Sequence, residues 1–205
     1  MRVGIDIDNT IICYDGVFAS VARLIGHNID GGFSKEKTKD WFHSRNMYNE
    51  FTELQGLIYG SYLGLSSLYD GVKGFLNRAS LMGCTVFIVS HKTRYPLIGG
   101  KVDLHNAASA FLLEQGIIKS KSSGLVPAEN LFYETSLNDK IERIAALQLD
   151  YFIDDLSDVL NHDSFPKSTH AIQFFPGTLG KSNLAGTRLS SWQDIHDFIL
   201  TPNFE

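Results

Sequence analysis

The fold is decided near the start of the chain, where the sequence reads Val3-Gly4-Ile5-Asp6-Ile7-Asp8-Asn9-Thr10. The apolar run predicts a buried strand, and residues two apart on an extended chain point to the same side. Two carboxylates placed in this way would repel each other strongly unless a cation lay between them. A divalent metal ion would meet this need. The simpler alternative is a pair of strand-end aspartates that cap the following turn.

Further apolar segments continue this pattern along the chain. Together with residues 2–8, strands are predicted at residues 85–90, 131–134, 151–154 and 170–175. Helical spacing of apolar residues occurs at 72–79, 104–112 and 141–147, and again near 191–200, where Trp192, Ile195, Phe198 and Ile199 are expected to face inward. Residues 176–189 are expected to form a loop. Alternating strands and helices predict an α/β, Rossmann-like parallel sheet of about five strands with helices on both faces.

One segment interrupts the alternation. Residues 15–69 are too long for an ordinary connection between a strand and the next helix, and they carry many aromatic residues and glycines. We interpret them as a small helical cap inserted into a core formed by residues 1–14 and 70–205. Most of the cap aromatics are expected to pack among themselves, although some could contact a ligand.

A second acidic pair, Asp154 and Asp155, ends the predicted strand at 151–154, and Asp158 follows as a candidate turn cap. Carboxyl ends of parallel strands meet at one edge of a sheet, so Asp6, Asp8, Asp154 and Asp155 are expected to converge there. Such hard oxygen ligands suit Mg²⁺. Ser90, at the end of another predicted strand, and Lys140, at the start of a helix, are expected at the same edge. Taken singly, Ser90 would be a turn residue and Lys140 a solvated side chain.

In this order, these residues resemble the four motifs of the haloacid-dehalogenase-like (HAD) superfamily. The matching positions are Asp6-x-Asp8-x-Thr10, Ser90, Lys140 and Asp154-Asp155. The resemblance covers about residues 1–160 apart from the insertion, and its first and last motifs are the most specific. It implies a Rossmann-like core, and many members carry a helical cap between the first two motifs.

The resemblance implies an Mg²⁺-dependent phosphatase that forms an aspartyl-phosphate intermediate. Asp6 would be the nucleophile and Asp8 the general acid and base. Mg²⁺ would be bound by Asp6, by the backbone carbonyl of Asp8 and by Asp155, with Asp154 as the alternative ligand. Ser90 and Lys140 would contact the phosphoryl group, and an aspartate at position 8 favours phosphoryl transfer over dehalogenation.

Other residues are candidates for binding the substrate. Thr10 is expected to order the turn beneath Asp6. The loop after Ser90 carries His91, Lys92 and Arg94, which could select an anionic or sugar-like part of the substrate. A basic surface loop without a ligand is the alternative. A sugar phosphate and a nucleoside monophosphate both remain possible substrates.

Composition narrows the classes of protein. The 205 residues include 18 Lys and Arg against 23 Asp and Glu, a net charge of -5, which disfavours a nucleic-acid polymer as partner. Without a leader or a long apolar run, and with two cysteines, the chain is expected to be cytoplasmic and not membrane-bound. Its oligomeric state is not predictable from these features.

Two other functions compete with the phosphatase. A response-regulator receiver also combines acids, a hydroxyl and a lysine around Mg²⁺, but its acidic pair comes from the first strand and its lysine from the last. Here the order is reversed, since Asp154 and Asp155 follow Lys140. A catalytically retired HAD-like domain that binds phospholigands is the second alternative, although every residue needed for turnover is present.

Overall fold

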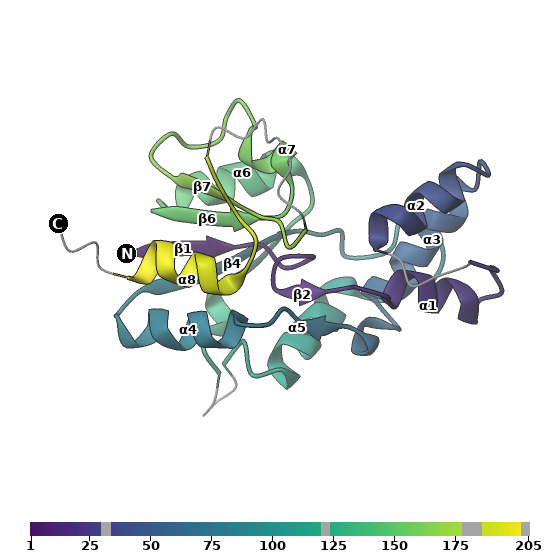
Figure 1. Cartoon of the computed structure of the whole chain (residues 1–205), viewed down its shortest axis with the longest axis horizontal. Helices are drawn as coiled ribbons and strands as arrows, with labels where there is room; N and C mark the ends of the chain where they lie inside the picture. Colours follow the sequence, from purple (N-terminus) through teal and green to yellow (C-terminus); the bar gives the residue numbers. More distant parts are fainter. Residues whose placement is uncertain (30–33, 120–123, 178–185, 202–205) are drawn as a thin grey trace.

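A parallel sheet of six strands forms the centre of the molecule (Figure 1). The computed structural model describes residues 1–29, 34–119, 124–177 and 186–201. The sheet order is β5-β4-β1-β6-β7-β8. The strands are β1 (Arg2–Ile5), β4 (Thr85–His91), β5 (Leu131–Glu134), β6 (Tyr151–Asp154), β7 (His170–Phe174) and β8 (Thr187–Leu189). The predicted α/β class is therefore confirmed.

Two strand predictions need correction. β8, which pairs parallel to β7, lies in a segment predicted to be loop. Its three residues are all half-buried, so this edge strand has no apolar run that would mark it in the sequence. The other predicted loop residues at 178–185 lie outside the described part of the chain. β1 also ends at Ile5, so Asp6 and Asp8 belong to the turn that follows the strand.

Helices cover both faces of the sheet, because alternate residues of the strands point in opposite directions. In β4, Phe87 and Val89 belong to one core cluster, whereas Val86 and Ile88 belong to the other. α6 (Leu137–Ala146) and α7 (Ser157–Leu160) cover the first face. α4 (Val72–Leu81), α5 (Leu104–Glu114) and α8 (Trp192–Leu200) cover the second. Figure 1 shows α6 and α7 on the side of the sheet opposite α4 and α8.

The last helix, α8, faces the core largely as expected. Trp192, Ile195 and Ile199 are buried, but Phe198 is 43% exposed and was wrongly predicted to point inward. Phe198 instead contacts Tyr151 and His170 near the surface. None of the helices within the described ranges is long and apolar enough to cross a membrane.

A separate helical cluster consists of α1 (Val17–Leu24), α2 (Lys35–His43) and α3 (Tyr48–Tyr59). In Figure 1 it lies beyond the carboxyl end of β1, and α3 packs against α5. Phe18, Phe42 and Phe51 are buried within it, as expected for aromatics that pack among themselves. A two-stranded antiparallel ribbon of β2 (Ile12–Cys13) and β3 (Ser67–Leu68), next to the short helix η1 (Leu63–Leu65), joins the cluster to the sheet.

The turn after β1 connects these two parts of the molecule. Asn9 adopts a left-handed conformation with φ of 56°, which Asn tolerates better than most residues. The amides of Ile11 and Ile12 both donate to the carbonyl of Ile7 at 2.9 Å, which closes the turn. Because the chain turns here, Asp6 and Asp8 lie at the carboxyl edge of the sheet, and the residues that follow the turn lead to the helical cluster.

Candidate functional site

The polar residues predicted for the sheet edge come together there. β1 lies between β4 and β6, and its last residue, Ile5, is in register with Ile88 and Ile153. Asp6 therefore follows β1 directly beside the end of β6, where Asp154 and Asp155 lie. Lys140 reaches this edge from the first turn of α6, a helix capped by Ser136.

Lys140 joins the two buried acids. Its Nζ atom lies 2.6 Å from Oδ1 of Asp6 and 2.7 Å from Oδ2 of Asp154. All three residues are at most 5% exposed. Burial lowers the pKa of Lys140, but the charges of Asp154 and Asp6 raise it by more, so the ammonium remains charged. Burial raises the pKa of Asp6 to about 7, even though Lys140 opposes the change.

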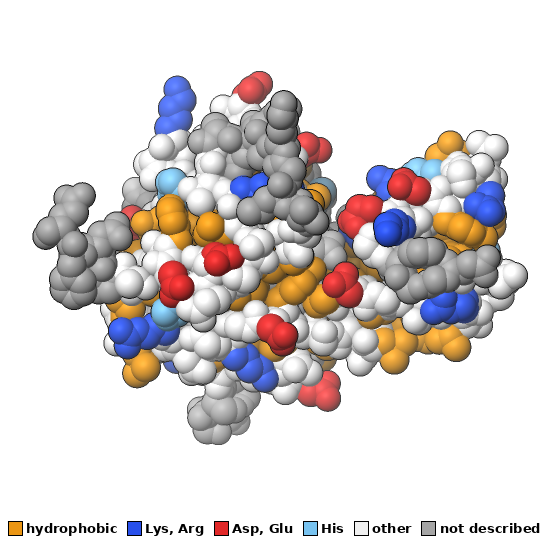
Figure 2. Space-filling view, viewed as in Figure 1, with side chains coloured by type: hydrophobic (Ala, Val, Ile, Leu, Met, Phe, Trp, Pro, Cys, Tyr) orange, Lys and Arg blue, Asp and Glu red, His pale blue; other side chains and the backbone are white. Residues whose placement is uncertain are grey.

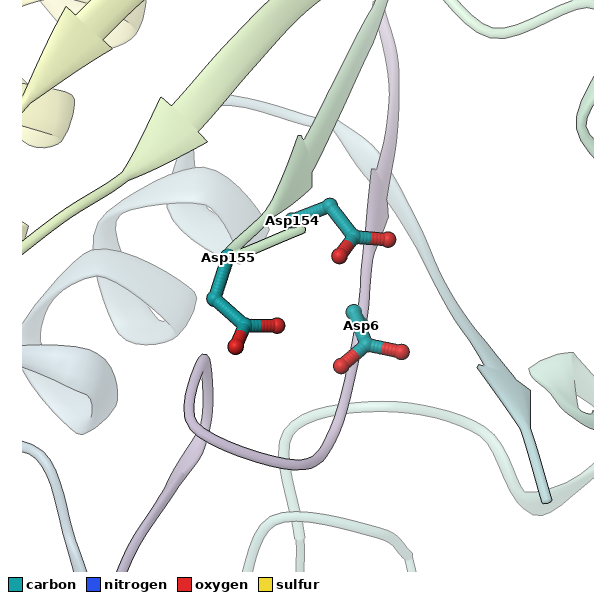
Figure 3. Close-up of side chains that lie close together, drawn as sticks. All are labelled: Asp6, Asp154 and Asp155. Carbon is teal, nitrogen blue, oxygen red and sulfur yellow. The ribbon is translucent and has the colours of Figure 1, made fainter. Parts of the chain in front are cut away.

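Three carboxylates form an acidic cluster at this edge: Asp6, Asp154 and Asp155. One oxygen of each lies within 4.8 Å of the others, and Figure 3 shows the carboxylates gathered around a common space. Burial, with the charges of Asp154 and Asp6, raises the pKa of Asp155 well above its ordinary value. Lys140 offsets one of the three negative charges, and a divalent cation would balance the two that remain.

The donor set fits a hard divalent metal ion. The side chain of Asp155 accepts no hydrogen bond from the described residues, while its carbonyl is held by Gln173 at 3.0 Å. Both oxygens of Asp154 are already engaged, one by Lys140 and the other by the amide of Leu156 at 2.9 Å. Asp155 and the free oxygen of Asp6 are therefore better placed as direct ligands than Asp154.

Asp8 departs from the expected convergence. Its side chain is not part of the acidic cluster and instead has its own cation, because Oδ2 lies 2.7 Å from Nζ of Lys92. The hydroxyl of Tyr14 donates to Oδ1. Burial alone would raise the pKa of Asp8, but Lys92 and Tyr14 outweigh it and lower the pKa below its ordinary value.

A cavity of about 300 Å³ opens beside Asp8, between α3 and the loop that follows β4. Its lining includes Thr52, Gln55 and Tyr59 from α3, and His91, Lys92 and Thr93 from the strand end and loop. The lining of a second cavity, of about 470 Å³, includes Asp155, which follows β6, and Lys35 from α2. The helical cluster therefore lines both of the spaces that adjoin the acidic residues.

The remaining predicted residues occupy different environments. Ser90 is buried one residue before the end of β4, and its hydroxyl has no hydrogen-bond partner among the described residues. The hydroxyl of Thr10 is equally buried and unpartnered, while its carbonyl accepts from Nε1 of Trp192 at 3.1 Å. Thr10 lines neither of the two cavities. Arg94 is exposed and pairs with Asp103 at 2.9 Å, outside the site.

Three residues at the site were not singled out as site residues from the sequence: Tyr14, Lys35 and Tyr59. Nζ of Lys35 lies 5.6 Å from the centre of the Tyr59 ring. Burial lowers the pKa of Lys35, but Tyr59 and then Asp8 and Asp155 raise it by more. Nothing in the sequence distinguishes Lys35 from Lys37 and Lys39 on the same helix. Only the packing of α2 against α1 and α3 turns its first residue toward the acids.

Solved structures resemble the whole chain, although no protein-family model matches the sequence and no curated protein matches it significantly. A haloacid dehalogenase-like protein from Agrobacterium tumefaciens is 13% identical, with a TM-score of 0.59 over 97% of this chain and 96% of its own. A HAD family hydrolase from Deinococcus radiodurans, solved with bound phosphate and sodium, is 13% identical, with a TM-score of 0.55 over 96% of this chain and 93% of its own. A HAD phosphatase from Thermococcus onnurineus is also 13% identical, with a TM-score of 0.53 over 96% of both chains. Likeness at this level of identity establishes a shared fold.

Proposed function

Since the chain has the fold of the haloacid-dehalogenase-like hydrolases, we propose that it is a metal-dependent phosphatase that hydrolyses a small phosphomonoester. The main support is the arrangement of Asp6, Lys140 and Asp154, which are buried, with the half-buried Asp155, because it would combine a nucleophile with a site for a divalent cation. We further propose that the helical cluster, within residues 15–69, acts as a cap over the core formed by residues 1–14 and 70–205.

In the proposed reaction, Asp6 attacks the phosphorus atom and the bond from phosphorus to the ester oxygen breaks. This yields an aspartyl phosphate on Asp6 and the alcohol. Because Lys92 and Tyr14 lower the pKa of Asp8, Asp8 is ionised in the free protein, and it would take up the proton of the bound phosphomonoester monoanion and pass it to the alcohol. Asp8 then takes a proton from the water that cleaves the acyl phosphate, releasing inorganic phosphate and restoring Asp6. Asp8 borders the cavity beside it, so the departing alcohol has a place to bind.

Several groups would stabilise the phosphoryl oxygens. Ser90 offers a buried hydroxyl with no described partner, and Lys140 has one N–H left after its bonds to the two aspartates. Asp6, the backbone carbonyl of Asp8, and Asp155 would hold Mg²⁺, with Asp154 supporting them through Lys140. When bound, Mg²⁺ would offset negative charge on the transferring phosphoryl group.

The proposed class of substrate rests on the size of the two cavities and on the distribution of charge over the protein surface. Cavities of about 300 and 470 Å³ suit a metabolite such as a sugar phosphate or a nucleoside monophosphate rather than a polymer. On the face seen in Figure 2, basic and acidic side chains are interspersed and form no continuous basic surface. Both cysteines are free thiols, in keeping with the proposed cytoplasmic setting.

The test is hydrolysis of p-nitrophenyl phosphate by wild type and by Asp6→Asn, each with Mg²⁺ and with EDTA. We expect turnover by wild type that depends on Mg²⁺, and a loss of at least about a thousandfold in Asp6→Asn, because the nucleophile is removed. Asp158→Asn is the matched control, since Asp158 is exposed and outside the acidic cluster. Wild type that is inert with every divalent metal tried would favour a retired domain that only binds phospholigands.

A further inference from the structure

The cavity beside Asp8 contains a buried cation of its own, Lys92. This residue is 5% exposed, and its Nζ atom lies 2.7 Å from Oδ2 of Asp8 and 4.4 Å from the centre of the Tyr59 ring. An ammonium in such surroundings is stabilised only by the groups that it contacts, because water is largely excluded. The contacts of the Lys92 ammonium therefore indicate which chemical group a ligand would need in order to bind to it.

The backbone of Lys92 is held from two sides. Its amide donates to the carbonyl of Glu134 at 2.9 Å, and its own carbonyl lies 2.7 Å from Nε2 of His105. The His105 ring in turn stacks on Tyr133, with ring centres 4.4 Å apart. These contacts fix the position from which the Lys92 side chain extends, so its ammonium is pre-positioned at the wall of the cavity.

The donors of this ammonium are only partly satisfied. A lysine ammonium has three N–H groups, and in the described structure Lys92 uses one of them, toward Asp8. Among the lining residues that belong to the described part of the chain, Asp8 is the only carboxylate and Lys92 the only Lys or Arg. Two of the neighbouring hydroxyls already donate, that of Thr52 to the carbonyl of Tyr48 and that of Thr93 to the carbonyl of Tyr95, whereas the uncharged amide of Gln55 can still donate to a ligand. The cavity thus offers a ligand the two remaining N–H groups of an ammonium that is paired with Asp8, together with the neutral donor of Gln55.

We propose that this cavity binds a leaving group that carries a single carboxylate, so that the substrate is a small phosphorylated hydroxy acid. This inference rests on the proposed phosphatase function and specifies its substrate. Lys92 would pair with the carboxylate through the donors that Asp8 leaves free, while Asp8 faces the ester oxygen. A second phosphate is a poorer match, because one ammonium without a guanidinium fork leaves much of its charge unbalanced.

The geometry also limits the length of the leaving group. Lys92 contacts the same Asp8 carboxylate that would donate the proton to the ester oxygen. The carboxylate and the ester oxygen of the substrate would therefore be separated by only a few bonds. A compound with a three-carbon backbone meets this requirement, and a further hydroxyl group could accept from the amide of Gln55 and donate to the hydroxyl oxygen of Thr52.

The test compares 3-phosphoglycerate with glycerol 3-phosphate, which differ in having a carboxylate or a hydroxymethyl group at the same end. We expect wild type to favour the acid in kcat/KM by roughly tenfold to a hundredfold, the range for one hydrogen bond to a charged group. Lys92→Met should bring this ratio close to one, whereas Lys92→Arg should keep most of it. Arg94→Met is the control, because Arg94 is a cation on the same loop that pairs with Asp103 outside the cavity.

The ratio of the two substrates separates this inference from the broader function, since both are phosphomonoesters. Wild type that hydrolyses both equally, or prefers glycerol 3-phosphate, contradicts the carboxylate inference while leaving the phosphatase intact. A preference for the acid that survives in Lys92→Met shows that Lys92 does not confer it, which also refutes the inference. If wild type hydrolyses neither compound nor p-nitrophenyl phosphate, the phosphatase proposal itself fails, and the inference with it.

Discussion

Replacing Lys140 by Met should destabilise the fold strongly, because it removes the counter-charge of two buried carboxylates. The ammonium lies within 2.7 Å of both Asp6 and Asp154, and methionine retains much of its length without the charge. Breaking a buried ion pair by removing one partner reduces the free energy of unfolding by about 3 to 5 kcal/mol. Such a loss is a large part of the total stability of a typical domain.

The loss should depend on pH in a defined direction. The pKa of Asp6 is already raised to about 7 with Lys140 present, and removing the ammonium raises it further. A carboxyl group whose pKa is higher in the folded than in the unfolded state binds protons more tightly when folded. The stability of Lys140→Met relative to wild type should therefore improve as the pH falls from 8 toward 5.

Urea denaturation in EDTA at pH 8 and pH 5.5 measures both effects without interference from bound metal. Lys140→Met combined with Asp154→Asn should recover part of the loss at pH 8, because one of the two uncompensated charges is then removed. A loss below about 1 kcal/mol at pH 8, or an equal loss at both pH values, would show that Lys140 is not the counter-ion that its position indicates.

Two further predictions concern the cation sites. Asp155→Asn should abolish the rise in Tm that Mg²⁺ gives wild type, whereas Asp158→Asn should keep it; an equal rise in both variants excludes Asp155 as a ligand. Lys35→Met should raise KM for p-nitrophenyl phosphate about tenfold, because Lys35 contributes positive charge near Asp8 and Asp155. Lys39 is exposed on the same helix, so Lys39→Met should leave KM unchanged. Equal KM values in the two variants would rule out a role for Lys35.

Most strands of the sheet are predictable because each has a local signal in its own residues. Each of the five predicted strands contains an apolar run that ends in polar residues, and all five occur in the structure. β8 was missed because an edge strand of three half-buried residues needs little hydrophobicity. Phe198 was misplaced because helical spacing marks one face of α8 without showing how far the neighbouring strands extend beneath it.

Only those site residues whose positions follow from the ends of the strands were predictable. Asp6, Asp154 and Lys140 meet because the topology of a parallel sheet brings them to one edge. The separate pairing of Asp8 with Lys92 depends on the turn at Asn9, whose course is not evident from residue spacing. Contributions from the helical cluster, such as Lys35, depend on tertiary packing and leave no trace in the sequence alone.

The most direct test of the proposed chemistry is to identify the residue that receives the phosphoryl group. Wild type would be mixed with p-nitrophenyl phosphate and Mg²⁺, quenched in acid within one turnover, digested and analysed by mass spectrometry. We expect the peptide that contains Asp6 to gain one phosphoryl group, and the gain to be absent in Asp6→Asn. Hydrolysis that proceeds with Asp6 unmodified, or with the phosphoryl group on another residue, would contradict the assignment of Asp6 as nucleophile.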